Sequence, residues 1–214
     1  ELVLRLEGLR QTVDFDSTDS FLALLDASRR RTEDALLAAA NMVSGANLSS
    51  IPEFGQQLQL QWINAALAIR NLEPVHLNVD LGQEFFDQLD CEMPEHASIE
   101  SAIKVSVIMP AFNSAAWLPT AVRGLLKQTW RNLEVIIIDD CSSDETLAVA
   151  NSLASRDPRI RVISNKVNQG AYASRNYGLQ FARGHVITVH DADDWSHPRK
   201  IERQMLALQA QDNT

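Results

Sequence analysis

The chain has 214 residues, of which 45% are hydrophobic and 22% are charged, and its formal net charge is −9. This composition is typical of a globular protein and excludes a disordered chain. No apolar run reaches the roughly 18 residues that a membrane-spanning helix needs, so we expect no membrane span in this segment. The sequence begins with Glu1 and has no signal-peptide pattern, from which we expect an internal piece of a longer protein.

The negative charge is concentrated in the first half. Residues 1–102 carry 6 basic and 17 acidic side chains, a net of −11, whereas residues 103–214 carry 13 and 11, a net of +2. This asymmetry predicts a boundary near residue 100, with one domain over 1–100 and another over 101–214. An acidic first half would repel phosphate, so no nucleic-acid partner is expected.

The first hundred residues have the apolar spacing of helices. We expect one helix between about residues 19 and 45, a second over about 54–71 and a short one over 83–90. No residue pattern in these helices indicates a chemistry. The sequence therefore predicts a mainly α-helical accessory domain that could contact a partner or another domain.

The second half alternates between apolar strands and helical segments. Strands are expected at 103–109, 133–138, 160–163 and 185–190, and helices at 114–128, 143–155, 171–183 and 198–210. Ser142 and Glu145 have the spacing of a capping box for the second of these helices. The alternation predicts an α/β layer fold with parallel strands, and the nearly continuous apolar strands indicate a sheet covered on both faces.

Polar residues follow each expected strand, and a parallel sheet brings such strand ends together at one edge. These ends are Pro110 to Asn113, Asp139 with Asp140, Asn165 to Gly170, and Asp191 to Asp194. Two basic residues, Lys166 and Arg175, lie near them in the sequence. The set suits a nucleotide diphosphate bridged to a metal, because carboxylates bind the metal and sugar hydroxyls while basic side chains bind phosphate oxygens.

Three carboxylates, Asp191, Asp193 and Asp194, lie within four positions. Carboxylates this close repel one another unless a cation lies between them. The cluster is therefore a candidate site for Mg²⁺ or Mn²⁺, with a solvated acidic turn as the alternative.

Other nucleotide and hydrolase patterns are absent from the sequence. It has no Gly-x-Gly-x-x-Gly after the first expected strand, no Gly-x-x-x-x-Gly-Lys-Ser/Thr, no Gly-x-Ser-x-Gly and no His-Glu-x-x-His. A helix-terminus phosphate cradle, a serine nucleophile elbow and a zinc-protease site are thus excluded.

Four motifs in order carry a family resemblance. They read VSVIMPAFN at 105–113, VIIIDDCSSDET at 135–146, NQGAYASRNYGL at 168–179 and DADD at 191–194. The series resembles the donor-binding half of family 2 glycosyltransferases, which have the GT-A fold, a Rossmann-like and mostly parallel sheet. The resemblance covers about residues 103–210.

The resemblance implies inverting transfer of a sugar from a nucleotide-diphospho-sugar, commonly a UDP-sugar, to an acceptor hydroxyl with a divalent metal, Mg²⁺ or Mn²⁺. Whether the acceptor is a glycan, a lipid or a protein stays open. The implied nucleotide-pocket residues are Pro110, Ala111 and Phe112 along the pocket, Asp139 or Asp140 on the base, and Arg175 near the nucleotide or diphosphate.

The implied metal residues form the Asp-x-Asp motif. Asp191 and Asp193 make up this motif at the metal and the nucleotide, and Asp193 is the expected direct metal contact. Asp194 would assist at the ribose, the sugar or the metal.

The chain also departs from the family pattern. The family's catalytic base follows the Asp-x-Asp motif, but this chain ends at Thr214, so we expect a truncated domain that lacks the acceptor half and the base and transfers poorly. Phe112 stands where tyrosine is common, so a hydroxyl is missing. Cys141 stands where glycine is common and would be strained if the backbone needs a positive φ.

Two alternatives and two further expectations remain. The alternatives are a non-catalytic binding or scaffold module derived from a glycosyltransferase, and a nucleotidyltransferase of related fold.

An unpaired sheet edge would invite self-association. Cys91 and Cys141 have no metal-type spacing, which indicates reduced thiols and a cytoplasmic location, either free or at the inner face of the membrane through other parts of the parent protein.

Overall fold

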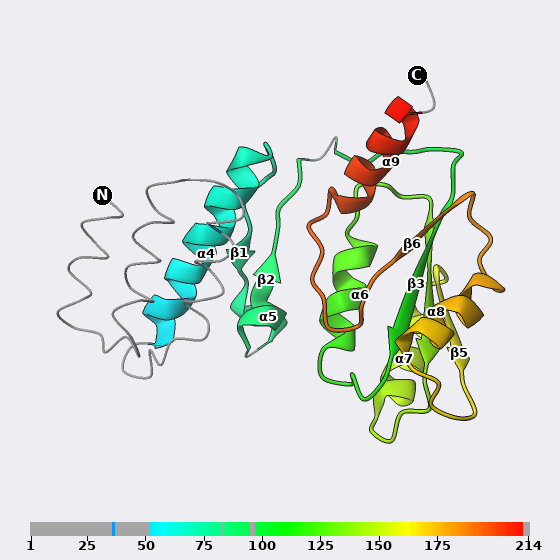
Figure 1. The fold of residues 1–214 in the computed structure, drawn as a ribbon. Coiled ribbons are helices and arrows are strands. Elements are labelled where there is room, and N and C mark those ends of the chain that lie inside the picture. Colours follow the sequence, from blue (N-terminus) through cyan, green and yellow to red (C-terminus); the bar gives the residue numbers. More distant parts are fainter. Residues whose placement is uncertain (1–35, 37–51, 83, 95–96, 212–214) are drawn as a thin grey trace. The chain divides into compact units, whose positions relative to one another are not determined.

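A computed structural model describes residue 36 and residues 52–82, 84–94 and 97–211 (Figure 1). The chain divides into two compact units, Glu1–Glu92 and Met93–Thr214. The helix expected between residues 19 and 45 lies outside the described residues, apart from residue 36. Residues 93–100, which the charge pattern assigns to the first domain, belong to the second unit, because Ile99 packs against its core and bridges to Trp130.

The first unit combines helices with a small antiparallel pair of strands. Within its described residues the elements are α4 (Pro52–Ile69), β1 (His76–Leu77), η1 (Val79–Leu81), α5 (Phe85–Gln88) and β2 (Leu89–Asp90). Helix α4 agrees with the expected helix over about 54–71. The helix expected over 83–90 is wrong at its end, because Leu89 and Asp90 pair with β1 as a strand.

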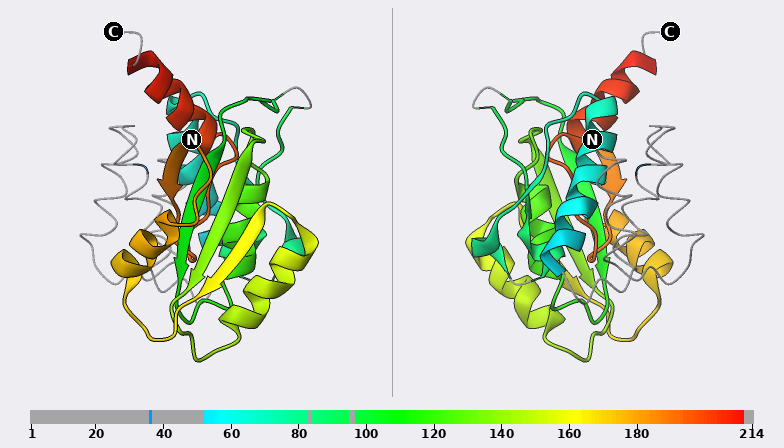
Figure 2. Two further views of the ribbon diagram at one scale, coloured as in Figure 1. Left: turned by 90° about the vertical axis from the view of Figure 1, so that its right-hand side faces the viewer. Right: turned by 90° about the vertical axis from the view of Figure 1, so that its left-hand side faces the viewer.

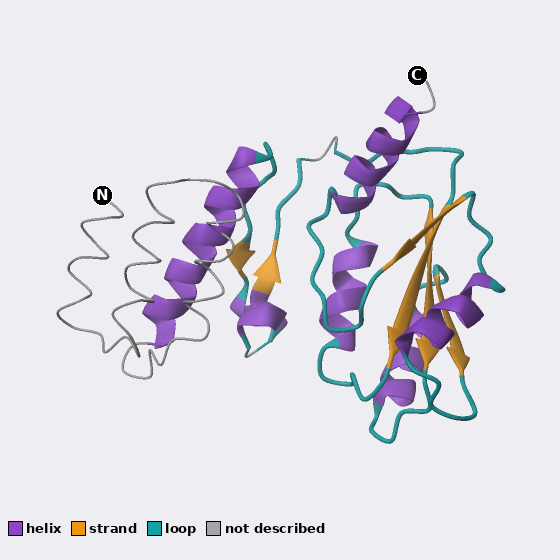
Figure 3. Ribbon diagram, in the orientation of Figure 1, coloured by secondary structure: helices purple, strands orange, loops and turns teal. Residues whose placement is uncertain are grey.

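The second unit is an α/β domain built on four parallel strands. The strands are β3 (Val105–Ala111), β4 (Leu133–Asp139), β5 (Ile160–Ser164) and β6 (Val186–Val189), in the sheet order β5-β4-β3-β6. The helices between and after them are α6 (Leu118–Leu126), α7 (Thr146–Arg156), α8 (Ala171–Leu179) and α9 (Lys200–Gln211). Figure 3 shows the alternation of strands and helices that the apolar pattern predicted, so the expected α/β class is confirmed.

Helices cover both faces of this sheet, which lies between α7 and α8 in Figure 2. The larger core joins alternate residues of β3 and β4, such as Val107 and Ile137, to apolar residues of α6, α7 and α9. On the other face Ile108, Ile136 and Ile138 pack beneath α8 and the residues that follow it. Strands β3 and β4 are buried throughout because they are central in the sheet.

The chain reverses its direction across the sheet between β3 and β6. From β3 it proceeds to β4 and then β5 on one side, and it returns to place β6 on the other side of β3. In open parallel sheets such a switch point lies beneath the usual ligand crevice, at the carboxyl ends of the strands. The residues that follow β3 and β6 are therefore the first to consider as a site.

Two local expectations were wrong. Pro110 lies inside β3 instead of ending it; the strand tolerates the missing N–H because pairing with β6 ends at Ile108. The capping box is absent, since Ser142 Oγ accepts a hydrogen bond from the N–H of Asn113 and Glu145 makes no side-chain cap. Asp144 Oδ1 accepts from the Thr146 N–H at 2.9 Å instead.

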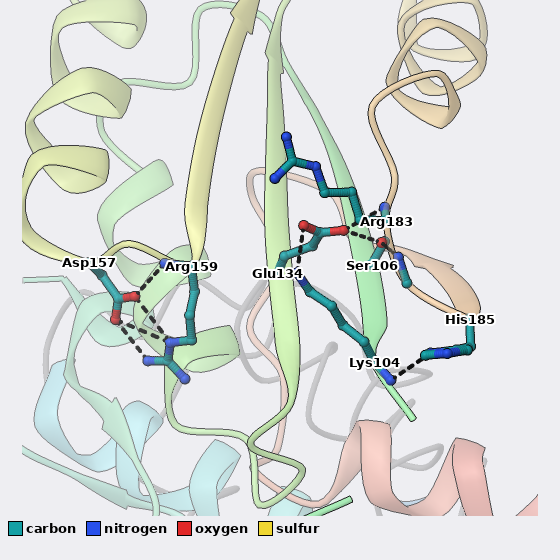
Figure 4. Close-up of polar contacts among 8 residues, drawn as sticks. Lys104, Ser106, Glu134, Asp157, Arg159, Arg183 and His185 are labelled. Atoms are coloured by element: carbon teal, nitrogen blue, oxygen red, sulfur yellow. Dashed lines mark hydrogen bonds and ion pairs between the residues drawn. The ribbon is translucent and has the colours of Figure 1, made fainter. Parts of the chain in front are cut away.

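A buried polar network ties the amino ends of the central strands together (Figure 4). Glu134 accepts hydrogen bonds from Ser106 Oγ at 2.6 Å, from Lys104 Nζ at 3.0 Å and from the N–H of Arg183 at 2.7 Å. These contacts lie at the opposite ends of the strands from the candidate site, and they fix the register of β3 against β4.

Strand β6 is an edge of the sheet, and Ile187 and Val189 expose 45% and 49% of their surface. Self-association through this edge stays a prediction. Among the described residues, no helix is both long enough and apolar enough to cross a membrane.

Candidate functional site

The loops that follow β3 and β4 are joined by hydrogen bonds at the carboxyl edge of the sheet. Asn113, with a φ of 50°, donates its N–H to Ser142 Oγ at 3.0 Å, and its side-chain oxygen accepts from the Ser143 N–H at 2.9 Å. The Ser114 N–H donates to Thr146 Oγ1 at 2.7 Å. The two loops thus form one rigid rim of the site.

The three expected pocket residues of β3 differ in access. Pro110 and Ala111 are buried in the strand, whereas Phe112, the first residue beyond it, is 49% exposed. Of the three, only Phe112 therefore has a side chain that is free to contact a ligand, and Ala111 belongs to the larger core.

Asp139 and Asp140 are both buried, but their carboxylates have different surroundings. Asp139 Oδ2 accepts from Ser164 Oγ at 3.2 Å, and its Oδ1 is buried with no hydrogen-bond partner among the described residues. The Asp140 carboxylate accepts from the N–H groups of Gln169 and Gly170, at 3.0 and 2.7 Å, and from the Asn165 side chain at 2.7 Å.

These contacts make Asp140 the anchor of the turn that leads into α8. Burial alone would raise the pKa of the Asp140 carboxyl, but the hydrogen bonds from Asn165, Gln169 and Gly170 outweigh burial and hold it below its usual value. Asn165 extends the contact to the buried Ser174 of α8 at 3.0 Å. No local sequence pattern indicated this role for Asn165, because its partners lie 9 and 25 positions away.

Arg175 links α8 to the loop after β6. Its Nη2 atom lies 2.5 Å from Asp191 Oδ1, and its guanidinium lies over the Tyr172 ring, 5.5 Å from the centroid. Arg175 Nε is buried and has no hydrogen-bond partner among the described residues. The structure therefore brings together the two residues that the sequence placed at the diphosphate and at the Asp-x-Asp motif.

The three acidic residues after β6 are accessible. The Asp191 side chain is 48% exposed, and Asp193 and Asp194 are exposed. Burial and the charges of Asp191 and Asp193 raise the pKa of the Asp194 carboxyl, against the opposing effect of the Lys200 charge. In the described part of the chain, no three acidic, histidine or cysteine side chains already form a metal-binding group.

Two groups that sequence reasoning assigned no ligand role lie behind the acidic loop. His190 is buried, with Nε2 3.1 Å from Ser196 Oγ, and burial together with the Lys200 charge lowers its pKa to about 4. Burial also lowers the pKa of Lys200, against the opposing effect of Asp194 and Asp191. The only sequence signal for Lys200 was its place near the start of the helix that follows the acidic loop.

The remaining candidates are not drawn into this cluster. Lys166 is exposed, and its backbone oxygen accepts a weak contact from Cys141 Sγ at 3.7 Å. Cys141 has a φ of 61°, which is the condition under which strain was expected at this position.

A switch point, two acidic strand ends and an arginine from the facing helix lie at the carboxyl edge of this parallel sheet, where open α/β sheets bind their ligands. Residues 106–214 match the sequence model of glycosyl transferase family 2, and the chain belongs to this family. The expected family and its GT-A type of α/β sheet are thereby confirmed. The match does not include residues 1–105.

Several curated relatives share this segment. The chain is 39% identical over 112 residues to the putative glycosyltransferase EpsE of Bacillus subtilis, covering 52% of this chain and 40% of that protein. It is 37% identical over 101 residues to an uncharacterized glycosyltransferase of Haemophilus influenzae, covering 47% and 40%. The chain thus spans about two fifths of the length of these relatives.

Solved structures show a more distant likeness. Staphylococcus aureus TarS in complex with UDP-GlcNAc has a TM-score of 0.47 and 27% identity, over 50% of this chain and 32% of TarS.

Proposed function

We propose that this chain carries the donor-binding part of a glycosyltransferase that uses a nucleotide-diphospho-sugar, with a UDP-sugar as the expected donor. The sugar would pass with inversion to an acceptor hydroxyl. Family membership over residues 106–214 and relatives that are named glycosyltransferases support this proposal.

The observation that carries the proposal is the pairing of Arg175 with Asp191 beside the switch point. The pair places a guanidinium and carboxylates where the ends of β3 and β6 diverge, and a nucleotide diphosphate needs both. A diphosphate accepts hydrogen bonds from arginine, while carboxylates hold the cation that neutralises it.

The residues fit a divalent cation in their chemistry. Asp191, Asp193 and Asp194 offer hard oxygen ligands on one loop. We assign Asp193 as the direct ligand, with Asp191 and Asp194 beside it. When bound, Mg²⁺ or Mn²⁺ would stabilise the charge that grows on the leaving diphosphate.

The chain's own residues would hold the nucleotide. Phe112 offers an exposed ring for the base, and Pro110 and Ala111, the last two residues of β3, are assigned beside it. Asp139 or Asp140 would accept a hydrogen bond from the base, and the unpartnered Oδ1 of Asp139 is one available acceptor. No residue of this chain is assigned as the catalytic base.

Two further assignments belong to the same proposal. Residues 1–100 would form an accessory domain beside the donor-binding domain over 101–214, and they carry no assigned chemistry. Cys91 and Cys141 form no disulfide within the described residues, which supports a cytoplasmic location, where thiols remain reduced.

Calorimetry with UDP and Mn²⁺ tests the donor site. We expect the 214-residue chain to bind UDP more tightly with Mn²⁺ than with EDTA, and Asp193→Ala to abolish this difference because it removes the metal ligand. Asp157→Asn is the matched control, since Asp157 pairs with Arg159 away from the site, and it should bind like the wild type (Figure 4).

Three outcomes would contradict the proposal. A folded wild-type chain that binds no UDP at millimolar concentration would indicate a scaffold module. Selective binding of a nucleoside triphosphate would indicate a nucleotidyltransferase. An Asp193→Ala variant with the wild-type response to Mn²⁺ would remove Asp193 from the metal site.

A further inference from the structure

Arg175 and Asp191 form the shortest link across the candidate site. The Nη2–Oδ1 distance is 2.5 Å, and the two side chains are 25% and 48% exposed, so the pair is partly shielded from solvent. Arg175 reaches it from the second turn of α8, and Asp191 from the second residue after β6. The contact therefore depends on the tertiary structure and is not a local helix pair.

This pair compensates one charge of an acidic loop that carries two more. Asp193 and Asp194 lie two and three positions beyond Asp191 and are exposed. Of these three carboxylates, within the described residues, only Asp191 has an arginine at hydrogen-bond distance. The guanidinium thus acts as a built-in counter-ion for the carboxylate that a divalent cation would otherwise share.

The arginine also has unused hydrogen-bonding capacity. Its Nε is buried and unpartnered within the described residues, although one end of the guanidinium is held by Asp191. An arginine fork binds phosphate oxygens through two parallel N–H groups. A buried donor without a partner is costly, so an anion that reached Nε would be strongly favoured.

We propose that Arg175 and Asp191 exchange partners when donor binds: the guanidinium turns from Asp191 to the diphosphate, and the freed Asp191 carboxylate joins Asp193 at the cation. This inference rests on the proposed function and adds a mechanism of coupling to it. Arg175 is then a residue that suppresses binding of the metal alone and favours binding of metal and diphosphate together.

An exchange of partners and a purely positioning role of Arg175 predict different affinities for the metal when Arg175 is removed. If Arg175 competes with the cation for Asp191, its removal strengthens binding of the metal alone and weakens binding of the diphosphate alone. If Arg175 merely held Asp191 in a geometry ready for the metal, its removal would weaken both. The two roles therefore predict opposite signs for the affinity of the metal.

The experiment measures the two affinities separately on Arg175→Gln. Binding of Mn²⁺ without nucleotide is followed by the electron paramagnetic resonance signal of the free ion, and binding of UDP and uridine in EDTA by calorimetry. We expect Mn²⁺ affinity to rise about fivefold and UDP affinity to fall about tenfold, within the usual range of coupling between sites, with uridine unchanged.

Two control variants separate exchange from a general field effect. Lys200→Gln removes one positive charge that acts on Asp191 and Asp194, so it should raise Mn²⁺ affinity less than Arg175→Gln if direct pairing is what matters. Arg159→Gln breaks an arginine–aspartate pair outside the site and should leave both affinities unchanged.

A second variant covers the case in which Arg175→Gln does not fold, as judged by its circular dichroism. Arg175→Lys keeps the charge but lacks the planar fork, so it should lower the preference for UDP over uridine and raise Mn²⁺ affinity above that of the wild type, by less than about fivefold. Unchanged values for both would overturn the exchange.

Two other results would also overturn it: weaker Mn²⁺ binding in Arg175→Gln, or an equal rise in Lys200→Gln. A wild-type chain that binds neither UDP nor Mn²⁺ with UDP would instead overturn the proposed function itself.

Discussion

At the scale of single residues, the backbone of the site loops is held in uncommon conformations. Asn113 and Cys141 have φ angles of 50° and 61°, and they follow β3 and β4 at the edge where the site lies. Asparagine tolerates the left-handed region because of its short polar side chain, but cysteine has no such advantage. Cross-loop hydrogen bonds through Asn113 hold this geometry in place.

We expect Cys141→Val to lower the free energy of unfolding by about 1–2 kcal/mol relative to Cys141→Gly, because a β-branched side chain is strained at positive φ. Urea unfolding of both variants measures the difference. Cys141 is exposed, so neither substitution disturbs the packing of the core, and the two variants at this position serve as each other's control. Equal stability of the two variants would show that no strain resides there.

At the scale of elements, α8 sets the position of Arg175. The helix approaches the sheet closely at Gly178, where an added Cβ would lie 2.6 Å from Ile108 Cγ2 and 3.3 Å from Ile138 Cγ1. Its amino end is anchored by Asp140 through Gly170, and its first turn by Asn165 through Ser174. Close packing at one end and the aspartate anchor at the other thus aim the arginine at Asp191.

We expect Gly178→Ala to destabilise the domain by about 1 kcal/mol, since overpacking exceeds the gain in helix propensity. The same substitution at Gly124 in α6 is the control, because its added Cβ meets nothing closer than 3.4 Å. Gly124→Ala should be neutral or stabilising in thermal unfolding. A Gly178→Ala variant as stable as Gly124→Ala would mean that α8 can shift without cost.

At the scale of the whole molecule, the two ends of the parallel strands differ. A polar network around Glu134 holds the amino ends together, and the candidate site lies at the carboxyl ends. Burial alone would raise the pKa of Glu134, but hydrogen bonds from Ser106, Lys104 and the Arg183 N–H hold it below its usual value. A carboxyl whose pKa is lowered by folding stabilises the protein above its unfolded pKa, and this contribution is lost as the pH falls through the folded pKa.

We therefore expect Glu134→Gln to lower the free energy of unfolding at pH 7 by about 1–3 kcal/mol, since donors lose a charged acceptor. The deficit should shrink as the pH falls below 4.5, the ordinary pKa of a glutamate carboxyl, because the unfolded chain is protonated there first, and it should be lost as the pH passes through the lowered pKa of the folded state. Urea unfolding at pH 7 and pH 3.5 measures it, with the exposed Glu145→Gln as the control. A deficit independent of pH would contradict this role of the charge.

Sequence patterns predicted the elements of this domain well because each strand is a short apolar run with polar residues at its end. The expected boundaries failed where side chains found distant partners. Ser142 bonds to Asn113 and not to its own helix, and Pro110 remains in β3 because its neighbour β6 is short. Neither the Ser142–Asn113 bond nor the extent of β3 can be predicted from neighbouring residues in the sequence.

The residues assigned to the candidate site stay a prediction, and the contacts that connect them were not predicted from the sequence. Asp139 and Asp140 are equivalent in the sequence, yet only Asp140 anchors the turn before α8, through N–H groups 29 and 30 positions away. Lys200 and His190 gained their buried surroundings only through the packing of α9 and the acidic loop.

The sequence by itself determined that apolar strands end in carboxylates and alternate with helices, because hydrophobic periodicity and turn residues act over short distances. Tertiary structure decided which of those ends are neighbours, since the order β5-β4-β3-β6 places the ends of β3 and β6 at the switch point. It also decided that Arg175 meets Asp191, because two elements must first pack on the same sheet before their charges can pair.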